Sequence, residues 1–221
     1  MTLSPASRRR YDASGRRAQA RANRQRILRE ATRLFGAHGY TATSIAEIAS
    51  GAGVSTPTVF AAFKSKVNLL KEAVDVAIAG DSGDLAFDDQ AVMRRVQEAP
   101  TAAEALRRYA EAIADLAHRA YPIYAVAHAA ADADPQIADL VADLDRQRLT
   151  AAGYIATTVA ARRGDADLSR IGFLRDTIWT LNSPLLYGLL VHQRGWSVEA
   201  YRDWVATALT ALATPAASVR Q

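Results

Sequence analysis

The sequence predicts an all-α protein, and three observations support that prediction. Alanine is abundant and only 7 of the 221 residues are proline, which favours helices because alanine has the lowest helix penalty of any residue and proline the highest. Apolar residues recur at the i, i+3, i+4 and i+7 spacing of one helix face. The chain contains no stretch that alternates polar and apolar residues as a half-buried strand does.

Composition excludes several other classes of protein. The chain has no cysteine, so disulfides and thiolate metal sites are ruled out, and a reducing, cytoplasmic location is expected. The longest apolar run falls well short of the roughly 18 residues that a membrane span needs. The arginines near the N-terminus are followed by no apolar segment, so we expect no signal peptide.

Charge is unevenly distributed along the chain. Residues 1–80 hold 13 Lys/Arg and 5 Asp/Glu, a net charge of +8, whereas residues 81–221 hold 14 Lys/Arg and 18 Asp/Glu, a net charge of −4. A basic first part on an acidic remainder indicates a polyanionic partner for the first part alone. A solvated basic tail explains the same pattern.

The first 22 residues are rich in arginine, including Arg16, Arg17 and Arg21, and poor in apolar residues. Little apolar surface is available there to offset the entropy cost of ordering the backbone. We therefore expect residues 1–22 to form a flexible basic arm.

A helix is predicted from about Asn23, with apolar residues on one face and Gly39 as a left-handed stop. The segment Ser44-Ile45-Ala46-Glu47 has the form of a capping box that opens a second, short helix. Glycines at 51 and 53 end it. Ser55 then caps a third helix with Pro57 in its first turn, where a missing N–H is not needed.

A fourth helix is expected from Ser65 or Lys66 to about Ala79, followed at 80–100 by a seam between domains that is rich in glycine and aspartate. Beyond the seam, apolar periodicity and caps predict helices near 101–118, 121–131, 135–163, 168–192 and 197–213. Asp134-Pro135 and Ser197 provide clear N-terminal starts. Pro184 is expected to kink or break the helix in which it lies.

The two short helices around the glycine turn define a helix-turn-helix, with Ile45–Ser50 as the positioning helix and Thr56–Ala62 as the reading helix. The side chains of the reading helix are short, so its backbone can lie deep in a DNA groove. Threonine hydroxyls can bond to base edges, and threonine or alanine methyls can contact thymine. Ordinary solvated helix surface is the alternative interpretation of the same residues.

Residues 24–70 resemble the DNA-binding domain of the TetR (tetracycline-repressor) family. The matching residues occur in order and at the family's spacing: Arg26-Ile27-Leu28, Leu34-Phe35, Gly39-Tyr40, Thr43, Ile48-Ala49, Ala52-Gly53-Val54-Ser55, Thr58-Val59-Phe60, Phe63, Ser65-Lys66 and Leu69-Leu70.

The resemblance implies a domain plan of a basic arm at 1–22, a three-helix DNA-binding domain at 23–70 and a helical effector-binding and dimerisation domain at 71–221. It implies a homodimer that binds a near-palindromic operator in double-stranded DNA and responds to a small-molecule effector, with no cofactor, no enzymatic activity and no membrane. The expected DNA contacts come from the arm and the helix-turn-helix: Arg16, Arg17, Arg21, Tyr40, Thr43, Ser44, Ser55, Thr56, Pro57, Thr58, Phe60, Lys64 and Lys66.

Two positions depart from the family's pattern. Phe60 stands where the family usually has a tyrosine whose hydroxyl bonds a phosphate, and Ala46 stands where some members have a long polar side chain. Both departures leave fewer direct contacts. Arginines of the arm can compensate, because an arginine arm can enter a narrow A·T minor groove.

Aromatic and polar residues of the C-terminal part are candidates to line an effector pocket, because such pockets are apolar with a few polar groups. The same residues can equally belong to a helical core. They are Tyr109, Tyr121, Tyr124, His128, Trp179 and Asn182.

The sequence shows no phosphate loop, no dinucleotide fingerprint and no catalytic triad, and its histidines lack metal-ligand spacing. The function expected is that of a sequence-specific DNA-binding transcriptional regulator, a repressor released by its effector. A constitutive architectural DNA-binding protein without effector is the alternative from another class, and a helical acid–base enzyme is a third.

Overall fold

The computed structural model describes residues 5–79 and 89–214, and for residues 5–14 and 89–90 it describes the backbone only. Within these ranges the chain is helical and contains no strand, as the sequence predicts. It divides into two compact units, Met1–Val74 and Asp75–Gln221. The boundary lies inside helix α4 (Lys66–Ala79), and so does the expected boundary at residues 70 and 71.

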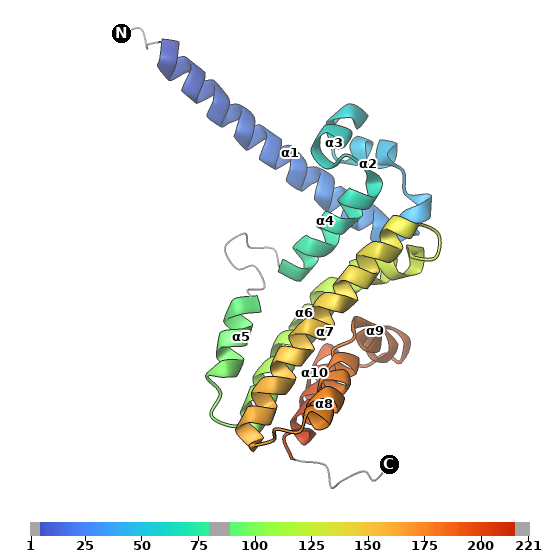
Figure 1. The fold of residues 1–221 in the computed structure, drawn as a ribbon. Coiled ribbons are helices and arrows are strands. Elements are labelled where there is room, and N and C mark those ends of the chain that lie inside the picture. The colour runs from blue at the N-terminus through green and yellow to red at the C-terminus, as the bar shows by residue number, and fades with distance from the viewer. Residues whose placement is uncertain (1–4, 80–88, 215–221) are drawn as a thin grey trace. The chain divides into compact units, whose positions relative to one another are not determined.

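The first unit contains α1 (Pro5–Ala42), α2 (Ile45–Gly51), α3 (Thr56–Phe63) and most of α4 (Figure 1). Gly39 interrupts α1 with a positive φ of 77°, which glycine adopts without steric cost. The core of this unit joins all four helices. Its fully buried side chains include Ile27, Phe35, Ile48, Leu69 and Leu70. Each large apolar side chain buried in this way contributes about 1.5–3 kcal/mol of hydrophobic stabilisation.

The basic segment differs from the expected flexible arm. From Pro5 onward its backbone is helical and continuous with the rest of α1. Alanine, arginine and glutamine dominate residues 16–26, and these residues have among the lowest helix penalties. Because elongating a formed helix is much easier than nucleating one, a segment packed at 27–35 can extend toward the N-terminus without burying apolar surface there.

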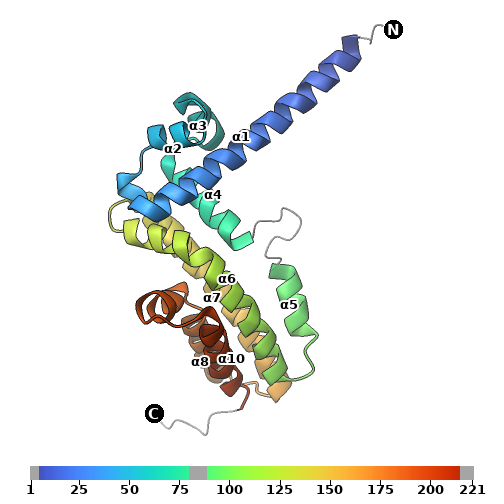
Figure 2. The ribbon, with the colours of Figure 1, turned by 180° about the vertical axis from the view of Figure 1, so that it is seen from behind.

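The second unit is built on two long helices, α6 (Ala102–Ala130) and α7 (Pro135–Arg163), which lie side by side. Helices α8 (Leu168–Leu181) and α10 (Val198–Ala211) cover one flank of this pair, and α5 (Asp89–Gln97) lies on the other (Figures 1 and 2). Small and aliphatic residues fill the interior. Ala105, Ala110, Ala114 and Ala156 are among those with no exposed surface.

Two predictions for this unit were wrong. The separate helices expected at 101–118 and 121–131 form one helix, α6, with Pro122 inside it. An interior proline costs about 3 kcal/mol. Burial of Ala120, Ile123 and Tyr124 around it offsets that cost. The seam expected at 80–100 contains helix α5 from Asp89, which packs Val96 into the core; residues 80–88 lie outside the described part.

The helix expected at 168–192 is broken near Pro184, as predicted. Helix α8 ends at Leu181, Ser183 caps α9 (Pro184–Tyr187), and a π-helix, η1 (Gly188–Gln193), follows. Gly188 lies against the Tyr121 ring, and a Cβ at this position would come within 2.3 Å of it. A side chain at 188 would therefore have to displace the end of the Tyr121 ring.

No helix in residues 5–79 or 89–214 combines the length and apolar character that crossing a membrane would need.

Candidate nucleic-acid interface and ligand cavity

The end of α1 is fixed by side chains that the sequence suggested as DNA contacts. Thr43 is only 2% exposed, and its hydroxyl donates to the Gly39 carbonyl at 2.8 Å and lies 3.2 Å from that of Leu34. The Lys66 ammonium donates to the carbonyls of Tyr40 and Thr43, each at 3.0 Å. It also lies over the buried Tyr40 ring. In this structure Thr43, Tyr40 and Lys66 therefore fix the end of α1 and join it to the start of α4.

The capping box predicted at α2 is present. The Ser44 hydroxyl accepts the Glu47 N–H at 3.2 Å, and the Glu47 carboxylate accepts the Ser44 N–H at 2.8 Å. These hydrogen bonds to Ser44 hold the pKa of the Glu47 carboxyl below its usual value. Ser44 is exposed, but its hydroxyl is already committed to Glu47.

Helix α3 begins after the tight turn that the sequence predicts. Gly53 has a positive φ of 64°, and Ser55 is the N-cap, with its hydroxyl 3.4 Å from the Thr58 N–H and 2.8 Å from the Thr58 hydroxyl. Pro57 occupies the first turn. Because the Ser55 and Thr58 hydroxyls bond to each other, they orient the helix start before any partner arrives.

One face of α3 is presented to solvent. Val59 and Phe63 are buried on the opposite face, whereas Thr56 is half-buried. The exposed side chains share the i, i+3, i+4, i+7 spacing of one helix stripe: Pro57, Phe60, Ala61 and Lys64. Phe60 is 47% exposed. The aromatic ring that stands in place of the family's tyrosine is therefore not buried in the core. We name these four residues the α3 face.

Arg24 holds α3 in place, a role that the sequence did not reveal. Its guanidinium forms a two-point ion pair with Glu72 of α4, donates to the Ala62 carbonyl of α3 at 2.6 Å, and lies 4.3 Å from the Phe63 ring centre. One side chain of α1 thus joins α3 and α4. A pairing across 48 residues leaves no local signal in the sequence.

Three arginines of the basic segment, Arg16, Arg17 and Arg21, are exposed on α1. The side chains of Arg8, Arg9 and Arg10 lie outside the described residues. The described arginines extend the positive charge of the first unit along the N-terminal half of α1.

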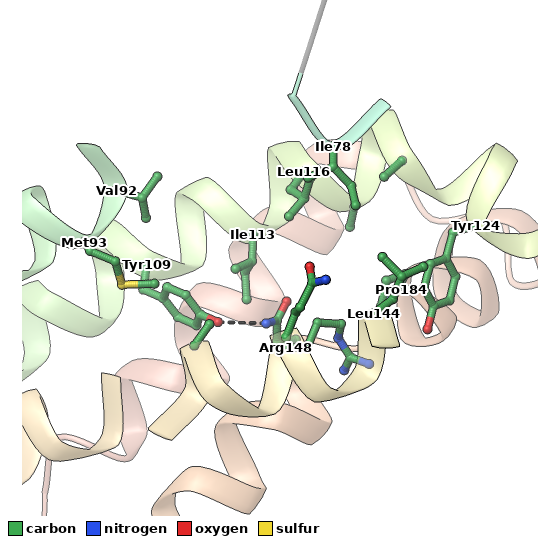
Figure 3. Close-up of a pocket in the computed structure, with 15 residues that line it drawn as sticks. Ile78, Val92, Met93, Tyr109, Ile113, Leu116, Tyr124, Leu144, Arg148 and Pro184 are labelled. Atoms are coloured by element: carbon green, nitrogen blue, oxygen red, sulfur yellow. Dashed lines mark hydrogen bonds between the residues drawn. The ribbon is translucent and has the colours of Figure 1, made fainter. Parts of the chain in front are cut away.

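The second unit contains a partly open cavity of about 110 Å³ between α5, α6 and α7, with contributions from the end of α4 and from the α8–α9 junction (Figure 3). Its wall is mostly apolar, and a few polar groups lie among the aliphatic ones. The lining residues are Ile78, Val92, Met93, Tyr109, Ile113, Leu116, Ala117, Ala120, Tyr124, Leu144, Gln147, Arg148, Ala151, Asn182 and Pro184.

Of the six residues suggested for an effector pocket, Tyr109, Tyr124 and Asn182 line this cavity. The other three do not. Tyr121 stacks on His192 with ring centres 4.5 Å apart, and His128 is exposed on α6. Trp179 packs under the guanidinium of Arg148, which lies 5.4 Å from the ring centre.

Sequence reasoning missed the aliphatic lining and Arg148. The aliphatic residues look like ordinary core positions in the sequence, and only the packing shows which of them face a space. The sequence could have indicated Arg148, because it is a charged residue on the same stripe of α7 as the buried Leu144 and Ala152. In the part of the chain that the structure describes, no group of three or more His, Asp or Glu residues is placed to hold a metal ion.

Two compact helical units, one with a capped helix-turn-helix and one with a mostly apolar cavity, define the class of all-helical helix-turn-helix proteins. Residues 27–73 match the model of the family described as bacterial regulatory proteins, tetR family. In residues 27–73, the first unit is therefore similar to the regulatory proteins of this family.

Individual relatives agree with this similarity. The chain is 38% identical over 53 residues to the HTH-type transcriptional repressor ComR of Escherichia coli, which covers 24% of this chain and 25% of that protein. The matched stretch thus spans about a quarter of that curated relative, so the activity of the whole chain does not follow from it.

Solved structures share the fold over most of the chain. The TetR family transcriptional regulator PfmR from Thermus thermophilus has a TM-score of 0.55 at 22% identity and covers 83% of this chain and 96% of its own. The transcriptional regulator FadR from Bacillus subtilis, solved in complex with stearoyl-CoA, has a TM-score of 0.63 at 15% identity and covers 84% of this chain and 97% of its own. At these identities the likeness concerns the fold alone.

Proposed function

We propose that this protein is a homodimeric, sequence-specific DNA-binding repressor that a small molecule bound in the second unit releases from its operator. The α3 face is the observation that carries the proposal. It is an exposed stripe on a short helix that is capped, buried on its other side and clamped by Arg24. A helix presented in this way is suited to enter the major groove of DNA.

The chemistry of the α3 face suits bases and phosphates. Phe60 and Ala61 are apolar groups that can contact thymine methyls, and Lys64 follows at the helix end, where it can pair with a phosphate. Arg16, Arg17 and Arg21 are placed to add contacts from α1. Thr43, Tyr40 and Lys66 are left out of the proposed contact set, because they hold α1 instead.

Exposed apolar side chains on the second unit support a dimer. Phe173 of α8 is 67% exposed, Leu189 of η1 is 46% exposed, and Leu168 and Leu185 are exposed as well. Contiguous apolar surface of this kind marks an interaction site. A two-fold dimer would pack residues 168–192 (α8, α9 and η1) and 197–213 (α10) against their symmetry mates and so cover these side chains.

The cavity supports an effector. Ile78, one of its lining residues, lies at the end of α4, the helix in which the boundary of the two units falls. A ligand in the cavity would contact α4 directly. The solved structure of the FadR neighbour is a complex with stearoyl-CoA, so a related fold takes up a ligand that carries a long acyl chain.

A gel-shift assay against genomic DNA fragments at two salt concentrations tests the proposal. We expect a few fragments to be retained in preference to random duplex, with affinity falling steeply as salt rises, because Lys/Arg–phosphate contacts release counterions. Deleting residues 1–20 should weaken binding and flatten its salt dependence. Equal retention of all fragments would favour the architectural alternative instead.

A further inference from the structure

The wall of the cavity contains very little charge. Twelve of its fifteen lining residues are aliphatic or aromatic, and the other three are Gln147, Arg148 and Asn182. Arg148 is therefore the one charged side chain of the lining. The class of ligand that fits depends on whether the Arg148 guanidinium is free to pair with a charged ligand group.

The charge of Arg148 is paired with a carboxylate inside the protein, although its buried Nε–H has no hydrogen-bond partner among the described residues. Its guanidinium donates to the Asp145 carboxylate at 2.7 Å and to the Trp179 carbonyl at 2.8 Å. Asp145 also accepts a hydrogen bond from the Tyr124 hydroxyl at 3.2 Å. Cation and anion thus form one pair at this end of the cavity, and the pair carries no net charge before a ligand arrives.

The tyrosines add no charge. Burial, together with the nearby Asp145 carboxylate, raises the pKa of the Tyr124 hydroxyl to about 12. Tyr124 therefore stays neutral at physiological pH. The remaining polar groups are amides and hydroxyls: Asn182 donates to the Tyr109 hydroxyl at 2.7 Å, as the dashed line in Figure 3 shows, and Gln147 lies nearby on α7.

From this wall we infer that the cavity binds an uncharged, mainly hydrocarbon molecule that carries one or two neutral hydrogen-bonding groups, such as a hydroxyl or a carbonyl. The inference rests on the proposed effector role of the cavity and specifies its ligand. A carboxylate would meet a guanidinium that Asp145 already neutralises, and an ammonium would find no anion among the lining residues. Amide groups such as those of Asn182 and Gln147 both donate and accept, so they match a neutral polar group.

The volume sets the scale of a suitable probe. An apolar cavity of roughly 150 Å³ holds a benzene ring, so a cavity of about 110 Å³ is suited to a small ring or a short branched chain. A second, open hollow lined by Asp143, Arg146, Thr150 and Tyr154 shares Met93, Gln147 and Ala151 with the cavity.

Three probes of nearly equal shape separate the possibilities: benzyl alcohol, benzoate and benzylammonium. Each is titrated into the full-length protein at neutral pH while the methyl resonances of Ile113 and Leu144, which line the cavity, are followed by NMR. Burying an unpaired charge costs several kcal/mol. We therefore expect benzyl alcohol to bind at least about tenfold more tightly than either ion, a difference of about 1.4 kcal/mol.

A charge-removing variant gives a second, independent test. Asp145→Asn leaves Arg148 without its carboxylate partner. The affinity for benzoate should therefore rise at least about tenfold relative to the affinity for benzyl alcohol. Asp143→Asn is the matched control, because Asp143 pairs with the exposed Arg146 and lines only the outer hollow. Asp143→Asn should leave the ratio of the benzoate affinity to the benzyl alcohol affinity unchanged.

Several outcomes would overturn the inference: tighter binding of either ion to the wild-type protein, no methyl shift with any probe, or an unchanged ratio in Asp145→Asn. DNA binding is measured separately, without probe. A protein that retains operator fragments but binds no alcohol refutes the ligand class alone. One that binds the alcohol but prefers no DNA fragment refutes the proposed regulatory function instead.

Discussion

The Lys66 ammonium lies 4.1 Å from the centre of the Tyr40 ring and donates a 3.0 Å hydrogen bond to the carbonyl of the same residue. Lys66 is the first residue of α4, and Tyr40 lies in the last turn of α1. One side chain thereby joins the start of α4 to the end of α1. Lys64, two residues earlier, is exposed on the α3 face instead.

The two lysines should therefore respond differently to the same substitution. Lys66→Met removes two hydrogen bonds from a charged donor, and we expect it to lower the free energy of unfolding by about 1–3 kcal/mol. Lys64→Met should leave stability unchanged but weaken DNA binding by a similar factor for operator and random duplex, since a phosphate contact carries no sequence information. Urea unfolding and fluorescence anisotropy measure the two effects. Equal losses of stability in both variants would disprove the assignment.

Phe60 offers a test of how the α3 face meets DNA. Because its ring is about half exposed, Phe60→Ala should cost about 1 kcal/mol of stability, less than the 3–5 kcal/mol typical of a buried phenylalanine. Phe60→Tyr should fold as well as the wild type and add a hydroxyl that can reach a phosphate, which tightens binding to all duplexes by about 1 kcal/mol. A loss of stability in Phe60→Tyr, measured by thermal unfolding, would place the ring edge in the core.

Gly188 tests the contact between η1 and α6. A methyl group there would come within 2.5 Å of the Tyr121 ring, which is itself held against His192 and Tyr187. We expect Gly188→Ala to lower the free energy of unfolding by about 1–3 kcal/mol through overpacking. Gly153→Ala on α7, where the nearest atom lies at an ordinary 3.7 Å, should be neutral or slightly stabilising. If chemical denaturation shows equal midpoints for the two variants, Gly188 does not lie in tight contact with the Tyr121 ring.

The proposed dimer interface predicts the effect of a buried charge. Leu189 is exposed on η1 and would be covered in the dimer, so Leu189→Arg should leave an uncompensated charge there and shift the protein to monomer. Leu149→Arg on α7 places the same charge at a leucine of similar exposure (36%) outside the proposed interface. Light scattering should report a monomer for the first variant and a dimer for the second. A dimeric Leu189→Arg protein would exclude Leu189 from the interface.

Local signals in the sequence predicted much of the first unit. Ser44, Ser55 and Pro57 mark helix starts by the chemistry of their own side chains, and the structure confirms each of them. The same kind of signal predicted α7 from Asp134 to Arg163. Caps are readable because their partners lie within a few residues along the chain.

What the sequence did not predict depends on partners far away along the chain. Pro122 should end a helix by local rules, yet the packing of Ile123 and Tyr124 keeps α6 intact. Lys66 donates to the carbonyls of Tyr40 and Thr43, which lie 26 and 23 positions earlier in the chain, and no local pattern indicates these hydrogen bonds. The cavity is defined by five helices at once, so its aliphatic lining has no signature in any one of them.

The central claim is that two copies of the α3 face read DNA together, and a cleavage-protection footprint on a retained genomic fragment tests it most directly. The account predicts two protected segments related by a two-fold axis, with centres about one helical turn (roughly 34–36 Å) apart or a multiple of that distance. Lys64→Met should weaken the protection in both segments equally. A footprint without two-fold symmetry, or uniform protection with no preferred site, would contradict the account.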